Sequence, residues 1–162
     1  MIIINNYQLE EIEDKVFYVR SNETNNCPVC EKLVYVQGVR RRKYITDSGD
    51  YHTLIIRRLR CRGCNKIHHE LPDKVIPYKR HCSDTIENII AGEVSGLPCE
   101  ESTVRRINNW WAACLLYFEN VLVSLRAKYG VVFSLRPAPK EIVRAVVNAS
   151  LWVHTRSAFL SG

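Results

Sequence analysis

Two cysteine pairs constrain this chain more than any other feature. Cys27 and Cys30 form a first C-x2-C turn, Cys61 and Cys64 form a second, and thirty residues lie between the two turns. Each short turn offers two thiolates to one ion, so two turns complete a tetrahedral zinc shell. Because four thiolates leave no open position for a substrate, we expect one structural Zn²⁺ on these residues.

The segment between the cysteine pairs predicts a small antiparallel sheet. Alternating apolar and polar residues predict strands over 32–39, 41–45 and 51–60, with a turn at 46–50. Two cysteine turns joined by such a sheet predict a zinc ribbon at 27–80, preceded by a strand or arm at 1–26. With few large apolar residues, this ribbon would draw its folding energy from the metal.

The other cysteines and histidines show no comparable spacing. A thioredoxin-like redox pair would need a βαβ unit, which the pattern does not show. His68 and His69 follow the second pair and stay open as alternative ligands. Cys82 and Cys99 have no assigned role, whereas Cys114 falls on an apolar helical stripe and is interpreted as packing.

The second half of the chain predicts helices. A first helix follows Ser83, and a much longer one follows the Gly/Pro segment before Glu100. Residues of the long helix recur at intervals of three and four and form one apolar seam, 104–125, which can pack on a last helix near 140–153 or form a homodimer. The predicted fold class is α+β: a zinc ribbon, a helix-turn-helix-like segment at 81–112 and a long-helix or helical-hairpin tail at 113–162.

Positive charge is concentrated around the cysteines. The net charge is +6, but residues 32–80 alone carry thirteen Lys and Arg against four acidic residues, a balance of +9. Clustered positive charge is typical of a polyanion partner, although a solvated charged face looks similar. The residues expected to meet DNA phosphates are Arg40, Arg41, Arg42, Lys43, Arg57, Arg58, Lys79 and Arg80.

The start of the long helix adds a second group of polar side chains. In "ESTVRRINNWW", the residues Thr103, Arg105, Arg106 and Asn109 surround the apolar seam. Arg suits guanine and Asn suits adenine in the major groove, so this segment is expected to contact double-stranded DNA. A solvated helix surface would show the same pattern.

No stretch of the sequence indicates export or membrane insertion. Met1 precedes only three isoleucines, and the apolar run "LLYFENVLVSL" is interrupted by Glu119 and Asn120. We therefore expect a cytoplasmic, nucleoid-associated protein with no membrane partner, in which cysteines serve as thiols or ligands rather than in disulfides.

Three stretches together resemble a known family. "CPVC" followed by "RRLRCRGCNKIHHELPDKVIPYKRHCSDTIENIIAGE" and "ESTVRRINNWW" is similar to small bacterial zinc-ribbon proteins labelled transposase-like. It also resembles the N-terminal zinc-ribbon and helix-turn-helix region of insertion-sequence transposases. The resemblance covers roughly residues 27–111. It implies zinc on the four cysteines, DNA contacts over 102–109, and a mobile genetic element, with a transposase or recombinase as a further partner.

Catalysis is not expected. The resemblance would require the three carboxylates of a large RNase-H-like domain, and no such acidic triad is visible. Two alternatives to DNA binding stay open. One is an adaptor that docks on a recombinase or polymerase without affinity for DNA. The other is RNA binding, for which Tyr35, Tyr44 and Tyr51 would have to be exposed on the sheet.

Overall fold

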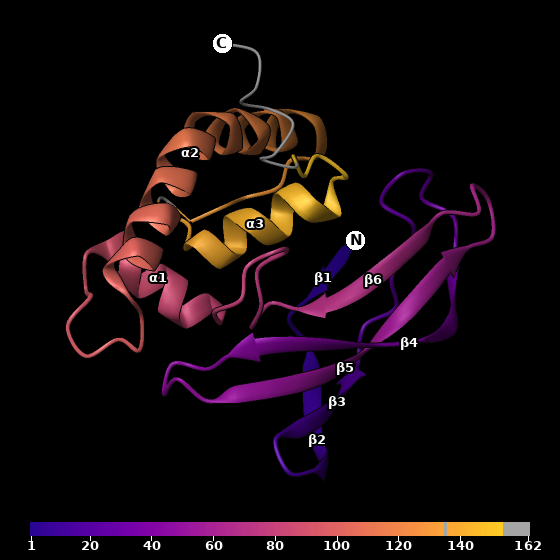
Figure 1. Cartoon of the computed structure of the whole chain (residues 1–162). Helices are drawn as coiled ribbons and strands as arrows, with labels where there is room; N and C mark the ends of the chain where they lie inside the picture. Colours follow the sequence, from indigo (N-terminus) through magenta and orange to yellow (C-terminus); the bar gives the residue numbers. More distant parts are fainter. Residues whose placement is uncertain (135, 154–162) are drawn as a thin grey trace.

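A computed structural model describes residues 1–134 and 136–153. Six strands and three helices follow in the order β1 (Ile2–Ile4), β2 (Tyr7–Glu13), β3 (Val16–Ser21), β4 (Val34–Ile45), β5 (Tyr51–Cys61), β6 (Ile67–Pro72), α1 (Ser83–Ala91), α2 (Glu101–Tyr129) and α3 (Pro139–Asn148). Figure 1 shows the strands in one curled sheet and the three helices gathered together on one side of it.

Strand β5 organises the sheet because both of its edges are paired. One edge pairs with β4 in an antiparallel ladder that runs from Ile45↔Tyr51 to Val34↔Cys61. The other edge is shared: β3 pairs with it in parallel near Leu54, and β6 pairs antiparallel near Leu59. Because two different strands divide one edge, the sheet cannot continue as a flat layer and curls instead. β1 extends it in parallel beyond β6, and β2 extends it beyond β3.

The predicted fold class was wrong: instead of a small antiparallel zinc ribbon with a helix-turn-helix-like segment and a long-helix tail, the described residues form a curled mixed sheet of six strands with three helices. The strands expected at 32–39 and 41–45 are one continuous strand, β4, and the turn at 46–50 connects it to β5. However, the cysteine turns do not enclose a separate small antiparallel ribbon. β1 and β3 come from the segment expected to be an arm, and their parallel pairings with β6 and β5 build a mixed sheet. Such pairings leave no local pattern, since the partners are far apart in the sequence.

The helix-turn-helix prediction was wrong as well. α1 and α2 are separated by residues 92–100, longer than the three- or four-residue turn of that motif. The seam of α2 is buried within the chain: Ile107, Trp111 and Phe118 belong to the core together with Val143 of α3. This packing is the intramolecular alternative of the sequence prediction, and homodimerisation stays a prediction. α3 ends at Asn148, before the expected end near 153.

A side-chain clamp connects α3 to the free edge of β1. The amide of Ile3 donates to Asn148 Oδ1 at 2.7 Å, and Asn148 Nδ2 donates to the Ile3 carbonyl at 2.9 Å. The carboxamide thus takes the place of a neighbouring strand on this edge, whose other side pairs with β6. Residues 1–26 and the helical segment are therefore joined to the same sheet. The expected tail beyond residue 153 lies outside the described residues.

Candidate metal centre and basic surface

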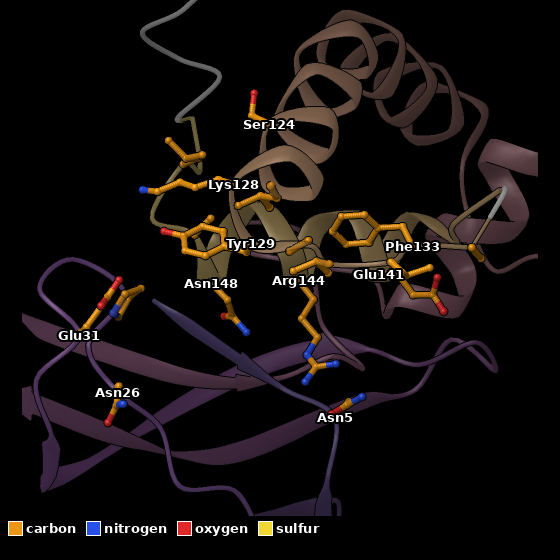
Figure 2. Close-up of a pocket in the computed structure, with 18 of the residues that line it drawn as sticks. Asn5, Asn26, Glu31, Ser124, Lys128, Tyr129, Phe133, Glu141, Arg144 and Asn148 are labelled. Carbon is orange, nitrogen blue, oxygen red and sulfur yellow. The ribbon is translucent and has the colours of Figure 1, made fainter.

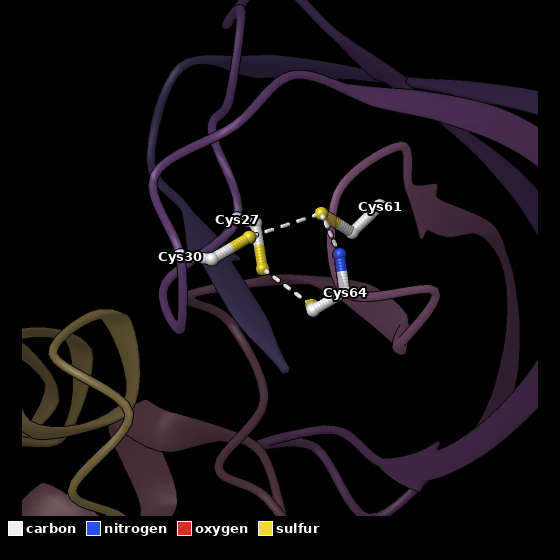
Figure 3. A group of neighbouring side chains, drawn as sticks. All are labelled: Cys27, Cys30, Cys61 and Cys64. Atoms are coloured by element: carbon white, nitrogen blue, oxygen red, sulfur yellow. Dashed lines mark hydrogen bonds between the residues drawn. The ribbon is translucent and has the colours of Figure 1, made fainter.

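The four predicted cysteines meet at one end of the sheet. Cys61 closes β5, Cys64 lies between β5 and β6, and the other two precede β4 (Figure 3). Their sulfur atoms all lie within 4.8 Å of one another. Closest are Cys30 and Cys61 at 3.3 Å and Cys27 and Cys64 at 3.6 Å. Tetrahedral bonds of about 2.3 Å to zinc would place sulfurs about 3.8 Å apart, so the spacing fits one ion.

The two cysteine turns have the same backbone construction. The amide of Cys27 donates to the carbonyl of Lys32 at 2.9 Å, and the amide of Cys61 donates to the carbonyl of Lys66 at 3.0 Å. Directly after each second cysteine comes a residue with positive φ, Glu31 at 61° and Asn65 at 59°. The shared backbone structure is matched by a repeat in the sequence, "CPVCEK" and "CRGCNK", in which a lysine follows each second cysteine by two positions. The cysteine spacing alone did not reveal this repeat.

Backbone amides around Cys61 favour its thiolate. The amides of Cys64 and Gly63 point at its sulfur, at 3.5 and 3.2 Å, and these hydrogen bonds lower the pKa of the Cys61 thiol to about 6. The thiolate is the form that binds metals. Gly63 also leaves little room for a side chain, because a Cβ there would lie 3.2 Å from Cys30 Sγ and 2.5 Å from Lys32 Cδ.

His68 contacts the four-cysteine cluster through Cys27. Its Nε2 lies 3.3 Å from Cys27 Sγ, and the side chain is buried. Burial lowers the pKa of His68 to about 4, so the ring is neutral at pH 7 and can donate from Nε2 to a thiolate. Donors of this kind orient metal ligands and tune their basicity. This role of His68 was missed in the sequence, where it was weighed only as a ligand.

The remaining cysteines lie apart from the centre. Cys82 is buried with its sulfur 3.1 Å from Thr85 Oγ1, and Cys99 Sγ lies 3.4 Å from Nδ1 of His81. Cys114 is buried on α2, in agreement with the packing interpretation. Among the described residues, Cys27, Cys30, Cys61 and Cys64 make up the group that could hold a metal ion.

Some of the side chains predicted to contact phosphates are exposed to solvent, and others are already bound to groups of the protein itself. Arg40, Arg41, Lys43 and Arg80 are exposed. Arg57, in contrast, donates from Nε and Nη2 to both oxygens of the buried Glu70 at 2.6 and 2.7 Å. An arginine held in this way by a buried carboxylate stabilises the sheet and is poorly available to DNA.

Lys79 is also committed to the protein. Its Nζ lies 3.8 Å from the centroid of the Trp110 ring, and burial lowers its pKa to about 8. A half-buried ammonium over an indole ring is a cation–π contact rather than an open phosphate site. Lys79 therefore fixes the 77–80 segment against α2.

The structure brings the two predicted basic groups together. Arg42 of β4 donates from Nη2 to the carbonyl of Lys79 at 2.5 Å. Arg106, in the second turn of α2, lowers the pKa values of Lys79 and His81 by its charge, after the larger effect of burial. The basic surface therefore runs from β4 across the 77–80 segment to the start of α2. On α2, Arg105, Arg106 and Asn109 are exposed and Thr103 is partly exposed.

The tyrosines named for RNA binding differ in exposure. Tyr44 is 2% exposed and belongs to the core, whereas Tyr51 is 70% exposed at the end of the hairpin. Tyr35 is exposed next to Arg62, whose guanidinium carbon lies 5.7 Å from the centroid of its ring. A stacking surface built from all three tyrosines is therefore absent from the described part of the sheet.

A cavity of about 880 Å³ separates the first cysteine turn from the helices (Figure 2). Arg144 extends into it from α3 toward the strands, and Lys128 of α2 lies at its side. Glu31 and Glu141 line the same cavity, so its charge is mixed. A cavity with both signs of charge does not favour a polyanion in the way that the basic surface does.

Titration of Lys79 gives a testable pH dependence. Its folded pKa of about 8 lies below the ordinary 10.5, so between these values the unfolded chain keeps a proton that the folded chain has released. Lys79 should therefore make the free energy of unfolding rise with pH from about 8, against an opposite contribution from Cys99 and Cys114, whose pKa values burial raises. Above pH 10 it should fall, because burial raises the pKa of Tyr44 to about 12 and also raises that of Tyr7.

Urea denaturation at a series of pH values checks this expectation. Lys79→Met keeps the contact with Trp110 and should remove the rise above pH 8 while leaving the fall above pH 10. An unchanged rise in the variant would show that another group causes it.

The fold and the four cysteines define a class: a mixed sheet with a four-cysteine cluster at one end that could hold a metal ion. The chain belongs to a family described as a domain of unknown function (DUF6431), whose model matches residues 27–107, half of the chain. The matched region begins at Cys27 and ends on α2, so it contains the four-cysteine cluster and the basic surface. Comparisons with curated proteins and with solved structures found no match.

In the described residues, no helix has the combination of length and apolarity needed to span a membrane.

Proposed function

We propose that this protein binds double-stranded DNA through the basic surface formed by β4, residues 77–80 and the start of α2. The observation that carries the proposal is the continuity of this surface across segments that are far apart in the sequence. Its exposed members are Arg40, Arg41, Lys43, Arg80, Arg105 and Arg106, of which Arg41 also lies 4.0 Å from Glu13, and Arg58 is partly exposed. The resemblance to transposase-like proteins supports a mobile genetic element, or its control, as the setting.

Zinc is the metal that the four thiolates favour. Soft sulfur ligands at tetrahedral spacing select Zn²⁺ over the oxygen-seeking ions, and a complete shell makes the ion structural. Four thiolates and one Zn²⁺ carry a charge of about −2, far less than the positive charge around them. The metal therefore holds the sheet end in shape without cancelling the basic surface.

The geometry also bears on sequence recognition. Arg105 and Asn109 stand one helical turn apart on α2, so both project on one side of the helix. Because the segment is no helix-turn-helix, base contacts by these residues require another way for α2 to approach a groove. Phosphate contacts supply most of the proposed affinity, and base contacts by Arg105 and Asn109 stay a prediction.

Salt dependence of duplex binding tests the proposal. Six phosphate contacts would give a slope of about −5 for log affinity against log salt. Arg40→Ala combined with Lys43→Ala removes two exposed cations that hold no structural partner in the described residues. The slope should flatten by about 2, equally on a selected and a scrambled duplex.

The matched control is Arg20→Ala combined with Arg126→Ala, which removes the same charge elsewhere on the surface. Its slope should stay at the wild-type value. Absence of binding to either duplex at low salt would overturn the DNA proposal, and equal effects of the two double variants would show that only net charge matters.

The adaptor is the second candidate, and one observation favours it. Leu116 and Val123 lie seven residues apart on the outer side of α2 and are 70% and 66% exposed, so both contribute to one exposed apolar stripe. A partner protein that covers this side would protect them. An adaptor would retain its partner in salt that abolishes DNA binding, so the salt series separates the two functions.

A further inference from the structure

A groove of about 510 Å³ runs along the free edge of β4, and we name it the β4 groove. It is lined by residues 40–45 of β4, by His69 of β6, and by Pro77, Tyr78 and Arg80. Six residues of extended chain span roughly 17 Å, so the groove is longer than a single phosphate group.

The charged side chains that line the β4 groove are all positive. Arg40, Arg42, Lys43 and Arg80 line it, and none of the described residues along its walls is acidic. The cations are close enough to affect one another: burial lowers the pKa of Arg42 first, and the charge of Arg40 lowers it further. Such crowding is unfavourable without an anion, so the groove favours a ligand that carries negative charge along its length.

Backbone donors reinforce this preference. The amide of Ile45 points away from β5 and donates to the carbonyl of Arg80 at 2.7 Å. Because amides alternate along a strand, those of Lys43 and Arg41 face the same edge as that of Ile45. This edge thus offers main-chain N–H donors beside the guanidinium groups, a combination suited to phosphate oxygens.

Two exposed tyrosines line the groove as well. Tyr51 is 70% exposed and Tyr78 is 59% exposed. Tyr78 also has a φ of 63°, a conformation that bulky residues rarely adopt. A strained backbone that presents an exposed aromatic ring beside a basic groove is a feature of binding sites rather than of simple packing.

We propose that the β4 groove binds an unpaired strand of DNA, with phosphates on the cations and bases stacked on Tyr51 and Tyr78. A basic groove that follows the backbone, together with aromatic rings for the bases, is the general solution for single-stranded nucleic acid. The inference rests on the proposed function and names its substrate: duplex DNA with an adjoining unpaired segment, such as a tail or an opened end.

Binding to two DNAs tests this inference. One is a blunt duplex, and the other is the same duplex extended by a short oligothymidine tail. The tail should tighten binding of the wild-type protein about fivefold or more, the gain expected when at least one base stacks. Tyr51→Ala combined with Tyr78→Asn should remove this gain, measured as the ratio of the affinities of the same variant for the tailed and the blunt duplex. Asn is chosen because it tolerates positive φ.

Tyr129→Ala is the matched control, since this exposed tyrosine lies at the far end of α2. It should keep the full gain from the tail. Photo-crosslinking of an iodouracil-substituted tail provides a second measurement, and the crosslinked peptides should contain Tyr51 or Tyr78.

The outcomes separate the two proposals. Equal binding of blunt and tailed duplexes by the wild-type protein would overturn the β4 groove inference while duplex binding stands. Binding of the tailed DNA alone would support the groove and overturn duplex binding. A gain from the tail that survives the double tyrosine substitution would place the unpaired strand elsewhere and reject the groove.

Discussion

Replacing Cys61 by serine is expected to release the metal and to lower the thermal midpoint by about 10 °C or more. Structural zinc contributes about 10–16 kcal/mol to small zinc-finger peptides, and we expect a loss of roughly 4 kcal/mol here, since a separate apolar core remains. For a chain of this size, each 1 kcal/mol corresponds to about 2–4 °C. Metal analysis should find one zinc per wild-type chain and none in the variant.

The loss of stability in the Cys61→Ser protein should be confined to the end of the sheet near the cysteines. β4 begins, β5 ends and β6 begins next to the cysteines, whereas Leu54 and Tyr44 are core residues far from them along the strands. Hydrogen exchange should therefore accelerate near Val34 and Leu59 before it does in α1. Cys99→Ser, which removes a half-buried thiol outside the centre, is the control. Unchanged exchange near Val34 in the Cys61→Ser protein, or a metal-free wild type, would contradict the metal centre.

The second large effect is expected from Glu70→Gln. Glu70 is 1% exposed and accepts hydrogen bonds from Arg57 on both oxygens and from Asn25 Nδ2 at 3.1 Å. Breaking a buried pair from one side costs about 3–5 kcal/mol, and we expect about 3 kcal/mol because Arg57 is 24% exposed and can be partly hydrated. Chemical denaturation measures this difference.

Two comparisons make the test specific. Glu10→Gln breaks a pair with Arg20 whose side chains are both more than half exposed, and it should cost less than about 1 kcal/mol. Replacing both partners, as Glu70→Leu with Arg57→Met, should recover most of the stability because no charge is left buried. A cost for Glu70→Gln as small as that for Glu10→Gln would show that the buried pair is unimportant.

The cluster of four cysteines could be predicted from the sequence because its signal is local. Each cysteine turn is four residues long, and sulfur chemistry leaves few alternatives for two such turns. The buried seam of α2 was visible for a similar reason, since helical periodicity is a property of neighbouring residues. These are the parts of the chain that short-range patterns determine.

The mixed sheet could not be predicted because long-range pairing defines it. Ile2–Ile4 were expected only to be part of an N-terminal strand or arm, yet these residues pair with Glu70, Leu71 and Pro72. In the sequence, Glu70 was counted only as one of four acidic residues in the basic segment 32–80. Its bond to Arg57 depends on the register between β5 and β6. The positive charges of the basic surface were identified from the sequence. The sequence did not show that Arg57 binds Glu70 or that Lys79 contacts Trp110, because those contacts depend on the fold.

The clamp between Asn148 and Ile3 has a consequence for the time course of folding in the cell. A ribosome releases the chain from its amino end, so β1 emerges first and the residue that covers its free edge emerges 145 positions later. Until α3 has left the exit tunnel, this edge is an open strand able to pair with other chains. Nascent chains should therefore be most vulnerable to aggregation, and most dependent on chaperones, during the interval between synthesis of β6 and synthesis of Asn148.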